Sequence, residues 1–137
     1  MPIHARASGL VLLAYSSPKL QNEVLSGELP QATSKTLRNP DQIRTLLAEI
    51  RHKGFIVAER FVHEDVSSAA VPVRGSDGSV VAAISIIVPT VTEASRAVPA
   101  LMAASRGIAR TFEASGDSTQ LLPPIRRMTA TPPSWPE

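Results

Sequence analysis

The chain has 137 residues, of which 43% are hydrophobic and 19% are charged, and its formal net charge is +2. This length predicts one domain with a core of its own and a short tail. So small a charge excess, without clustered Lys and Arg, argues against a nucleic-acid-binding face. The absence of cysteine excludes disulfides and thiolate metal sites. No apolar run reaches the length of a membrane span and the N-terminus lacks a signal-peptide layout, so we expect a soluble cytoplasmic protein with no membrane contact.

The first half of the chain carries three helical patterns. The apolar segment 7–15 is typical of a helix packed on several sides. A second helix follows Ser17, a good N-cap, and is closed by Gly27. The third is the clearest, because Asn39 caps its start and Gly54 ends it. Its apolar residues recur at i, i+3, i+4 and i+7, which predicts one buried face: Ile43, Leu46, Leu47 and Ile50.

The pattern then changes to the alternation that is typical of strands. We expect strands over 55–62 and 66–74, and the Asp-Gly turn within 76–79 leads into a third strand over 80–88. Strands joined by so tight a turn are antiparallel. Pro72 cannot donate a ladder hydrogen bond, which predicts that its strand lies at an edge or is bulged at that point.

A last helix is predicted over about 92–112, with a kink or a broken start at Pro99. Segment 116–137 holds five of the twelve prolines and little periodicity, which is typical of a disordered tail. The fold class is therefore α+β, an antiparallel sheet flanked by helices over residues 1–115. Three strands make a thin sheet, so we expect that N-terminal strands of the domain are missing from this chain. The sheet edges left exposed predict self-association, most simply as a homo-oligomer.

Four blocks of sequence resemble, in order and spacing, the effector-binding domain of IclR-type bacterial transcription regulators: "PIHARASGLVLLAY", "NPDQIRTLLAEIRHKGFIVAERF", "SSAAVPVRGSDGSVVAAISIIVP" and "VPALMAASRGIAR". The resemblance covers about residues 3–113. It implies a GAF-like domain that binds a small organic acid or aromatic catabolite and carries oligomer contacts. In the family such a domain normally follows a winged helix-turn-helix that binds operator DNA, which is absent from this sequence.

The resemblance also implies where an effector binds. Ala7 and Ser8 stand at the start of the first helix, where free N–H groups favour a carboxylate. Ser68 occupies the position of a family cysteine, and Ser85 and Ile87 occupy those of two family serines. The predicted effector-binding set is Ala7, Ser8, Ala58, Val66, Ser68, Ser85 and Ile87. The alternatives are that Ala7 and Ser8 only permit close packing and that Ser85 is satisfied by a neighbouring group.

Four positions depart from the family pattern. Leu10 replaces a lysine, Ala58 an aspartate, Asp65 a glycine and Ile87 a serine. Two hypotheses therefore stay open: a sensing domain with a changed or more apolar ligand, and a degenerate domain that acts only as a protein–protein association module. Polar groups that converge on a cavity favour the first. A cavity filled by Leu10, Val66 or Ile87 favours the second.

The "HEDV" segment is a candidate for a metal or acid–base cluster. His63, Glu64 and Asp65 are consecutive, so their side chains point in different directions and rarely share one ion; a solvated loop is the better prediction. The sequence has no G-x-S-x-G elbow and no cysteine, and its only local pair of base and nucleophile is His63 with Ser67 or Ser68. We therefore expect no catalytic residues, no metal, no cofactor and no enzyme activity.

Overall fold

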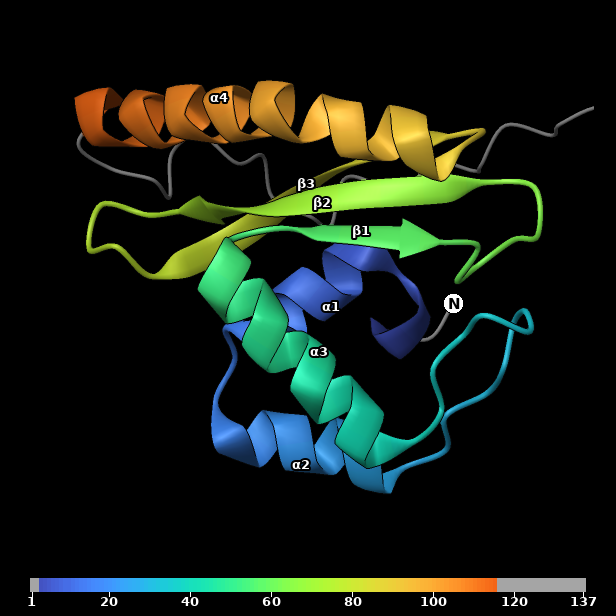
Figure 1. The fold of residues 1–137 in the computed structure, drawn as a ribbon. Coiled ribbons are helices and arrows are strands. Elements are labelled where there is room, and N and C mark those ends of the chain that lie inside the picture. Colours follow the sequence, from blue (N-terminus) through green and yellow to red (C-terminus); the bar gives the residue numbers. More distant parts are fainter. Residues whose placement is uncertain (1–2, 116–137) are drawn as a thin grey trace, which may run out of the picture.

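The computed structural model describes residues 3–115, so the predicted tail over 116–137 lies outside the described residues. These residues form a short 3-10 helix, four α-helices and a sheet of three strands, arranged as in Figure 1. In chain order they are η1 (Ile3–Ala5), α1 (Ala7–Ala14), α2 (Pro18–Ser26), α3 (Pro40–Lys53), β1 (Ile56–Glu59), β2 (Ser67–Arg74), β3 (Val80–Val88) and α4 (Val91–Ser115).

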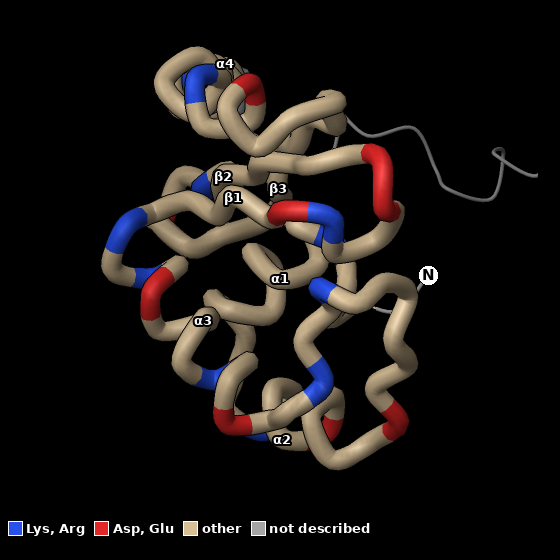
Figure 2. Tube along the Cα trace, turned by 45° about the vertical axis from the view of Figure 1, so that its right-hand side comes forward, with Lys and Arg blue, Asp and Glu red and all other residues tan. Residues whose placement is uncertain are grey.

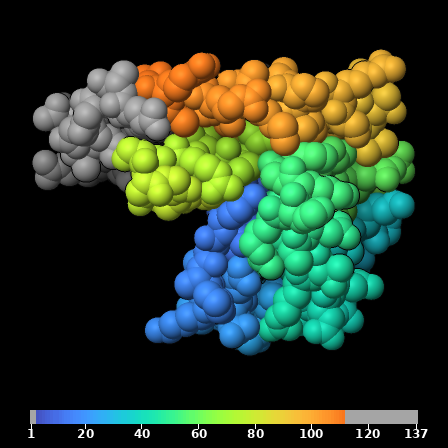
Figure 3. Space-filling model, turned by 60° about the vertical axis from the view of Figure 1, so that its left-hand side comes forward, coloured from blue at the N-terminus to red at the C-terminus, as the bar shows by residue number. Residues whose placement is uncertain are grey.

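The sheet separates two layers of helix. Its strand order is β1-β2-β3 and both pairs of neighbours are antiparallel. The long helix α4 lies along one face, while α1 lies on the other face with α3 and α2 beyond it (Figures 1 and 3). The predicted α+β class, with an antiparallel sheet flanked by helices, is confirmed.

The predicted helix ends agree closely with the structure. The Ser17 side chain accepts a hydrogen bond from the Leu20 N–H, at 3.2 Å, in the first turn of α2. Gly54 ends α3 in the left-handed conformation, with φ +82°, which favours glycine. These caps use local backbone groups that the sequence alone identifies, which explains why the helix boundaries could be predicted.

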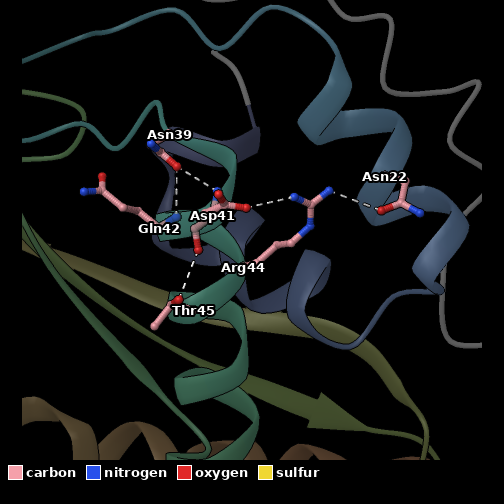
Figure 4. A network of polar contacts seen from close by, with 6 residues as sticks. All are labelled: Asn22, Asn39, Asp41, Gln42, Arg44 and Thr45. Atoms are coloured by element: carbon pink, nitrogen blue, oxygen red, sulfur yellow. Dashed lines mark hydrogen bonds and ion pairs between the residues drawn. The ribbon is translucent and has the colours of Figure 1, made fainter.

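At the start of α3, Asn39 Oδ1 accepts hydrogen bonds from the N–H groups of Asp41 and Gln42, at 2.8 and 3.3 Å (Figure 4). Arg44 follows on the same helix, 3.5 Å from the Asp41 carboxylate, and also donates to Asn22 of α2 at 3.4 Å. These side chains are exposed, so the network orients α2 beside α3 but contributes little to stability.

The first predicted strand is wrong in its second half. Strand β1 ends at Glu59, and Arg60 adopts a positive φ of 57°, which turns the chain out of the sheet. The carbonyl oxygens of Arg60 and Phe61 then accept hydrogen bonds from the hydroxyls of Thr33 and Thr36. A tertiary contact with the α2–α3 loop thus replaces strand pairing over 60–62.

The two prolines inside regular elements have different outcomes. Pro72 lies on β2, the central strand, but beyond the last residue paired with β1, so β2 is locally at an edge there, as predicted. The register irregularity that follows leaves Val81 of β3, and no residue of β2, without a partner, so a bulge at Pro72 is not observed. Helix α4 begins at Val91, well before Pro99, so a broken start at that proline is wrong. Pro99 has no N–H, so the Ser95 carbonyl one turn earlier lacks its helical hydrogen bond. Both residues are exposed, so water can donate a hydrogen bond to that carbonyl.

Two hydrophobic clusters form the core, one on each face of the sheet. Under α4, the buried residues Ala69, Val71, Ala94, Val98 and Leu101 pack with Phe55, Val57, Ile84, Ile86, Val88 and Met102. On the other face, α1 and α3 supply the large side chains, whereas the strands supply Ile56, Ala58 and Ala70 together with the partly buried Ala83. The sheet therefore carries mostly large side chains on the face under α4 and mostly small side chains on the face toward α1.

Candidate functional site

A cavity of about 250 Å³ lies on the face of the sheet toward α1, beside the start of that helix. Its walls come from α1, from the segment that follows β1, and from the adjoining ends of β2 and β3. The lining residues are Arg6, Ala7, Ser8, Phe61, Val62, Val66, Ser68, Ser85 and Ile87.

The cavity exists because the strands place small side chains there. Ser68 of β2 lies opposite Ala58 of β1 and Ile87 of β3, and Ser85 lies opposite Ala70. These positions share one face of the sheet because side chains alternate along a strand. Short side chains at Ser68 and Ser85 leave a hollow between the sheet and the start of α1, whereas Ala58 and Ala70 pack into the neighbouring core.

The floor of the cavity is the first turn of α1, and its position depends on close packing of η1 against α1. A Cβ atom at Gly9 would overlap the Ile3 carbonyl oxygen, so only glycine lets η1 lie against α1. Arg6 is the N-cap residue of α1 in extended conformation, and no side chain caps this helix. The first turn of α1, at Ala7 and Ser8, therefore faces the cavity without a capping oxygen.

Polar and apolar groups are divided within the lining. Arg6 is the only charged residue of the nine, and three serines, Ser8, Ser68 and Ser85, supply hydroxyls. The other walls are apolar or aromatic, at Phe61, Val62, Val66 and Ile87. Cationic and amide donors next to apolar walls suit a compact organic anion.

The structure brings together six of the seven residues that the sequence predicted for an effector site: Ala7, Ser8, Val66, Ser68, Ser85 and Ile87. Ala58 does not line the cavity, because its methyl group is buried in the α1 core. Of the other departures from the family pattern, Leu10 is buried in the same core and Asp65 is exposed, so only Ile87 alters the cavity wall. Asp65 does not have a positive φ. Among the described residues other than glycine, a positive φ is found at Arg60.

Three lining residues were missed: Arg6, Phe61 and Val62. Arg6 directly precedes the predicted floor, so its position beside Ala7 was a usable signal. The sequence predicts a strand at Phe61 and Val62, and the turn at Arg60 that moves them to the cavity leaves no clear mark in the sequence.

Buried polar residues hold the wall formed by Phe61. Thr36 donates to the Phe61 carbonyl and also accepts a hydrogen bond from the Thr33 N–H at 2.9 Å. On the other side of the loop, His4 Nε2 lies 2.9 Å from the Pro30 carbonyl oxygen. His4, Thr33 and Thr36 are each at most 5% exposed. The α2–α3 loop thus connects the two sides of the cavity.

The "HEDV" segment forms an exposed turn. The Asp65 N–H donates to His63 Nδ1 at 3.2 Å, and Glu64 accepts from the Ser34 N–H at 3.4 Å. Their three side chains are exposed, as expected of a solvated loop. Figure 2 shows acidic and basic residues scattered along the described chain rather than gathered on one element.

Comparison with known proteins identifies the family. The family model described as "Bacterial transcriptional regulator IclR C-terminal" matches residues 1–113. The chain belongs to this family. The IclR C-terminal domain is 35% identical over 91 residues to the Pca operon regulatory protein of Acinetobacter baylyi, a match that covers 66% of this chain and 33% of that protein. It is 30% identical over 114 residues to the Pca regulon regulatory protein of Pseudomonas putida, with 79% and 39% covered.

Solved structures give the same result for the fold. An IclR homologue from Microbacterium hydrocarbonoxydans, crystallised with 4-hydroxybenzoate, superposes with a TM-score of 0.79 at 36% identity. The match covers 83% of this chain and 47% of that one. This IclR C-terminal domain spans a third to two fifths of the length of the two Pca regulatory proteins. Within residues 3–115, no helix is both long and apolar enough to cross a membrane.

Proposed function

We propose that this chain is the effector-sensing part of an IclR-type transcription regulator, and that its cavity binds a small aromatic carboxylate. The observation that carries the proposal is the arrangement at the start of α1. There an uncapped helix N-terminus and Arg6 lie beside a cavity whose other walls are serine hydroxyls and apolar side chains.

In the proposed binding mode, the ligand carboxylate accepts hydrogen bonds from the first turn of α1 and pairs with Arg6. A helix N-terminus carries partial positive charge, so it favours an anion there. The ring lies against Phe61, Val62 and Ile87, and the hydroxyls of Ser68 and Ser85 remain for a polar substituent. The 4-hydroxybenzoate in the Microbacterium relative supports this class of ligand.

The regulatory role belongs to the whole protein of which such a domain is a part. The net charge is only +2 and the basic residues within 3–115 are scattered, so operator binding falls to another part of the regulator or to a partner. A ligand that prefers one quaternary arrangement of a cytoplasmic homo-oligomer would shift that arrangement, and with it the affinity for DNA. Residues 1–115 form the sensing unit in this proposal, and no catalysis or cofactor is involved.

The test is calorimetric titration of the chain with 4-hydroxybenzoate and with its uncharged analogue 4-hydroxybenzamide. We expect saturable heat with the acid and weaker binding of the amide, since the amide cannot pair with Arg6. Arg6→Gln should weaken binding of the acid by roughly tenfold, the value of one charge-assisted contact, and change binding of the amide little.

Ser85→Leu fills the cavity and should abolish binding, whereas Ser95→Leu, an exposed change on α4, is the matched control. Both variants should keep the far-UV circular dichroism of the parent chain. Flat titrations over a panel of benzoates would contradict sensing and favour the association module.

A further inference from the structure

A second cavity, of about 260 Å³, lies between the second half of α4 and the end of β2. It is lined by Met102, Ser105, Arg106 and Ala109 of α4, by the final residues of β2 and by Gly54, and we call it the α4 groove. None of its lining residues belongs to the lining of the cavity beside α1. The α4 groove is therefore a separate site, which the proposed function does not use.

The α4 groove exists because β1 does not cover the end of β2. The pairing of the two strands stops at Ile56 and Ala70. Gly54, with a φ of +82°, ends α3 just before β1, so the chain that precedes β1 is helical and leaves β2 uncovered beyond Ala70. Pro72 lines the groove at this uncovered end and has no N–H to offer a further strand. The space beside β2 thus suits a ligand better than a strand.

The helix that forms the other wall also loses its cover at this point. The lining residues of α4 are spaced at i, i+3, i+4 and i+7, so they share one face over about 10 Å of helix. Earlier in α4, Ala94, Val98 and Leu101 are buried against the sheet. From 102 to 111 no residue is buried, and this half of the helix lies over the β2–β3 hairpin (Figure 1). The inner face of α4 is therefore hollow there.

Two guanidinium groups and no carboxylate line the α4 groove, those of Arg74 and Arg106. Both side chains are exposed, and among residues 3–115 neither forms an ion pair. Arg74 is held in position, because its Nη1 donates to the Gly78 carbonyl at 2.9 Å and its Cζ lies 5.2 Å from the centre of the Tyr15 ring. A planar guanidinium group matches the geometry of a carboxylate, so this pair of positive charges favours an organic anion.

The rest of the lining is apolar or already hydrogen-bonded. The Ser105 hydroxyl donates to the Met102 carbonyl at 3.0 Å, which leaves the arginines as the charged donors. Val71, Pro72, Met102 and Ala109 supply apolar walls, and a methionine side chain adapts to irregular shapes. The lining therefore matches a ligand that has an anionic head and an apolar body.

We propose that the α4 groove is a second binding site, for a carboxylate with a flexible apolar chain. The carboxylate pairs with Arg74 and Arg106, and the apolar chain lies along Met102 and Ala109. A chain of medium length fits, because the face of α4 that lines the groove is about 10 Å long. This site is independent of the proposed function, so either can hold without the other.

Calorimetric titration of the full chain with octanoate tests the proposal, and 1-octanol is the uncharged control. We expect saturable heat with octanoate and roughly tenfold weaker binding of octanol, since the alcohol cannot pair with the two guanidinium groups. Octanoate should bind Ser85→Leu as tightly as the parent chain, because that substitution fills only the cavity beside α1.

Variants of α4 locate the bound ligand. Arg106→Gln should weaken octanoate binding by roughly three- to tenfold, the value of one exposed charged contact, whereas Arg110→Gln, an exposed change outside the groove, should not alter it. Ala109→Phe fills the groove and should abolish binding. Ala104→Phe places the same side chain on the exposed face of the helix and should retain it. Circular dichroism of every variant shows that the fold is kept.

Three titration results would overturn the proposal. They are a flat titration of the parent chain, octanoate binding that is lost in Ser85→Leu, and binding to Arg106→Gln that is as tight as in the parent chain. The second result would place octanoate in the cavity beside α1. Titration with 4-hydroxybenzoate in the same samples separates the two proposals: a chain that binds this acid but not octanoate lacks the second site and keeps the sensing function.

Other occupants of the α4 groove would overturn the proposal as well. Octanoate binding that is gained only in Leu121→Asp/Leu122→Asp would assign the groove to the segment that follows α4. A parent chain that self-associates in analytical ultracentrifugation, and dissociates in Ala109→Phe but not in Ala104→Phe, would assign it to a second copy.

Discussion

The two faces of the sheet are built from the same three strands but differ in how tightly their side chains are packed. Beneath α4, the face carries large or branched side chains such as Val57, Val71, Ile84 and Ile86, and they form a packed core. Facing α1, alternate positions of the same strands carry Ser68, Ala70, Ala83 and Ser85, and a cavity of about 250 Å³ remains.

This comparison shows that side-chain size at alternate positions decides which face is solid and which is hollow. Neighbouring residues of a strand point to opposite faces, so one residue can contribute to the packed core while the next lines the cavity. Changes under α4 should then alter the free energy of unfolding, whereas changes around the cavity should act mainly on binding and on the shape of the site.

The largest effect is expected from Leu101→Ala in the cluster under α4. Leu101 is 6% exposed and packs against β2, so its truncation should lower the free energy of unfolding by about 2–5 kcal/mol. Ile108→Ala on the same helix removes an exposed side chain and should change it by about 0.5 kcal/mol or less. Urea denaturation measures both, and equal losses would contradict the assignment of this face to the core.

Gly9→Ala should be next, because the new methyl group would overlap the Ile3 carbonyl oxygen. We expect a net loss of about 1–3 kcal/mol, although alanine favours a helix more than glycine does. The control is Gly107→Ala in α4, where a Cβ meets nothing within 4 Å. That variant should gain about 0.5–1 kcal/mol from helix propensity. Thermal melting gives both signs, and a stabilised Gly9→Ala variant would show that η1 does not lie against α1.

Thr36→Val tests the support of the cavity wall. The substitution keeps the side-chain shape but removes the hydroxyl that bonds the Phe61 carbonyl and the Thr33 N–H, at a cost of about 1–2 kcal/mol. Affinity for 4-hydroxybenzoate should fall as well, since Phe61 lines the cavity. Thr45→Val removes an exposed hydroxyl that bonds the Asp41 carbonyl and should change neither quantity. Unchanged affinity in Thr36→Val would mean that the loop does not position the wall.

The smallest effect concerns the turn before β3, far from both clusters. Hydrogen bonds from the Ser79 hydroxyl and N–H hold the pKa of the Asp77 carboxyl below its ordinary value. Because the folded-state pKa is the lower one, this stabilisation is complete above the ordinary pKa of aspartate. It is lost as the pH falls through the lowered value. Melting temperatures of the parent chain and Asp77→Asn should therefore differ slightly near neutral pH and converge in acid. A constant difference would show that the carboxylate is not the cause.

Much of the fold could be predicted from the sequence. Ser17, Asn39 and Gly54 marked helix ends because caps satisfy backbone groups within one turn. The Asp-Gly turn over 76–79 and the alternation after it predicted the β2–β3 hairpin. For the candidate site, a resemblance to a known family gave six of the residues that line the cavity, Ser85 among them, whereas Ala58 lies outside that lining.

What the sequence determined by itself was therefore local: caps, turns and the period of apolar residues, each of which depends on near neighbours along the chain. Only the tertiary structure decided that the chain leaves the sheet at Arg60, because Thr33 and Thr36, more than twenty residues earlier, bind the carbonyls of Arg60 and Phe61. The same holds for the hollow beside Ser85, which depends on the size of side chains from three strands and a helix at once. Such contacts join residues distant in sequence, and no pattern within a single segment records them.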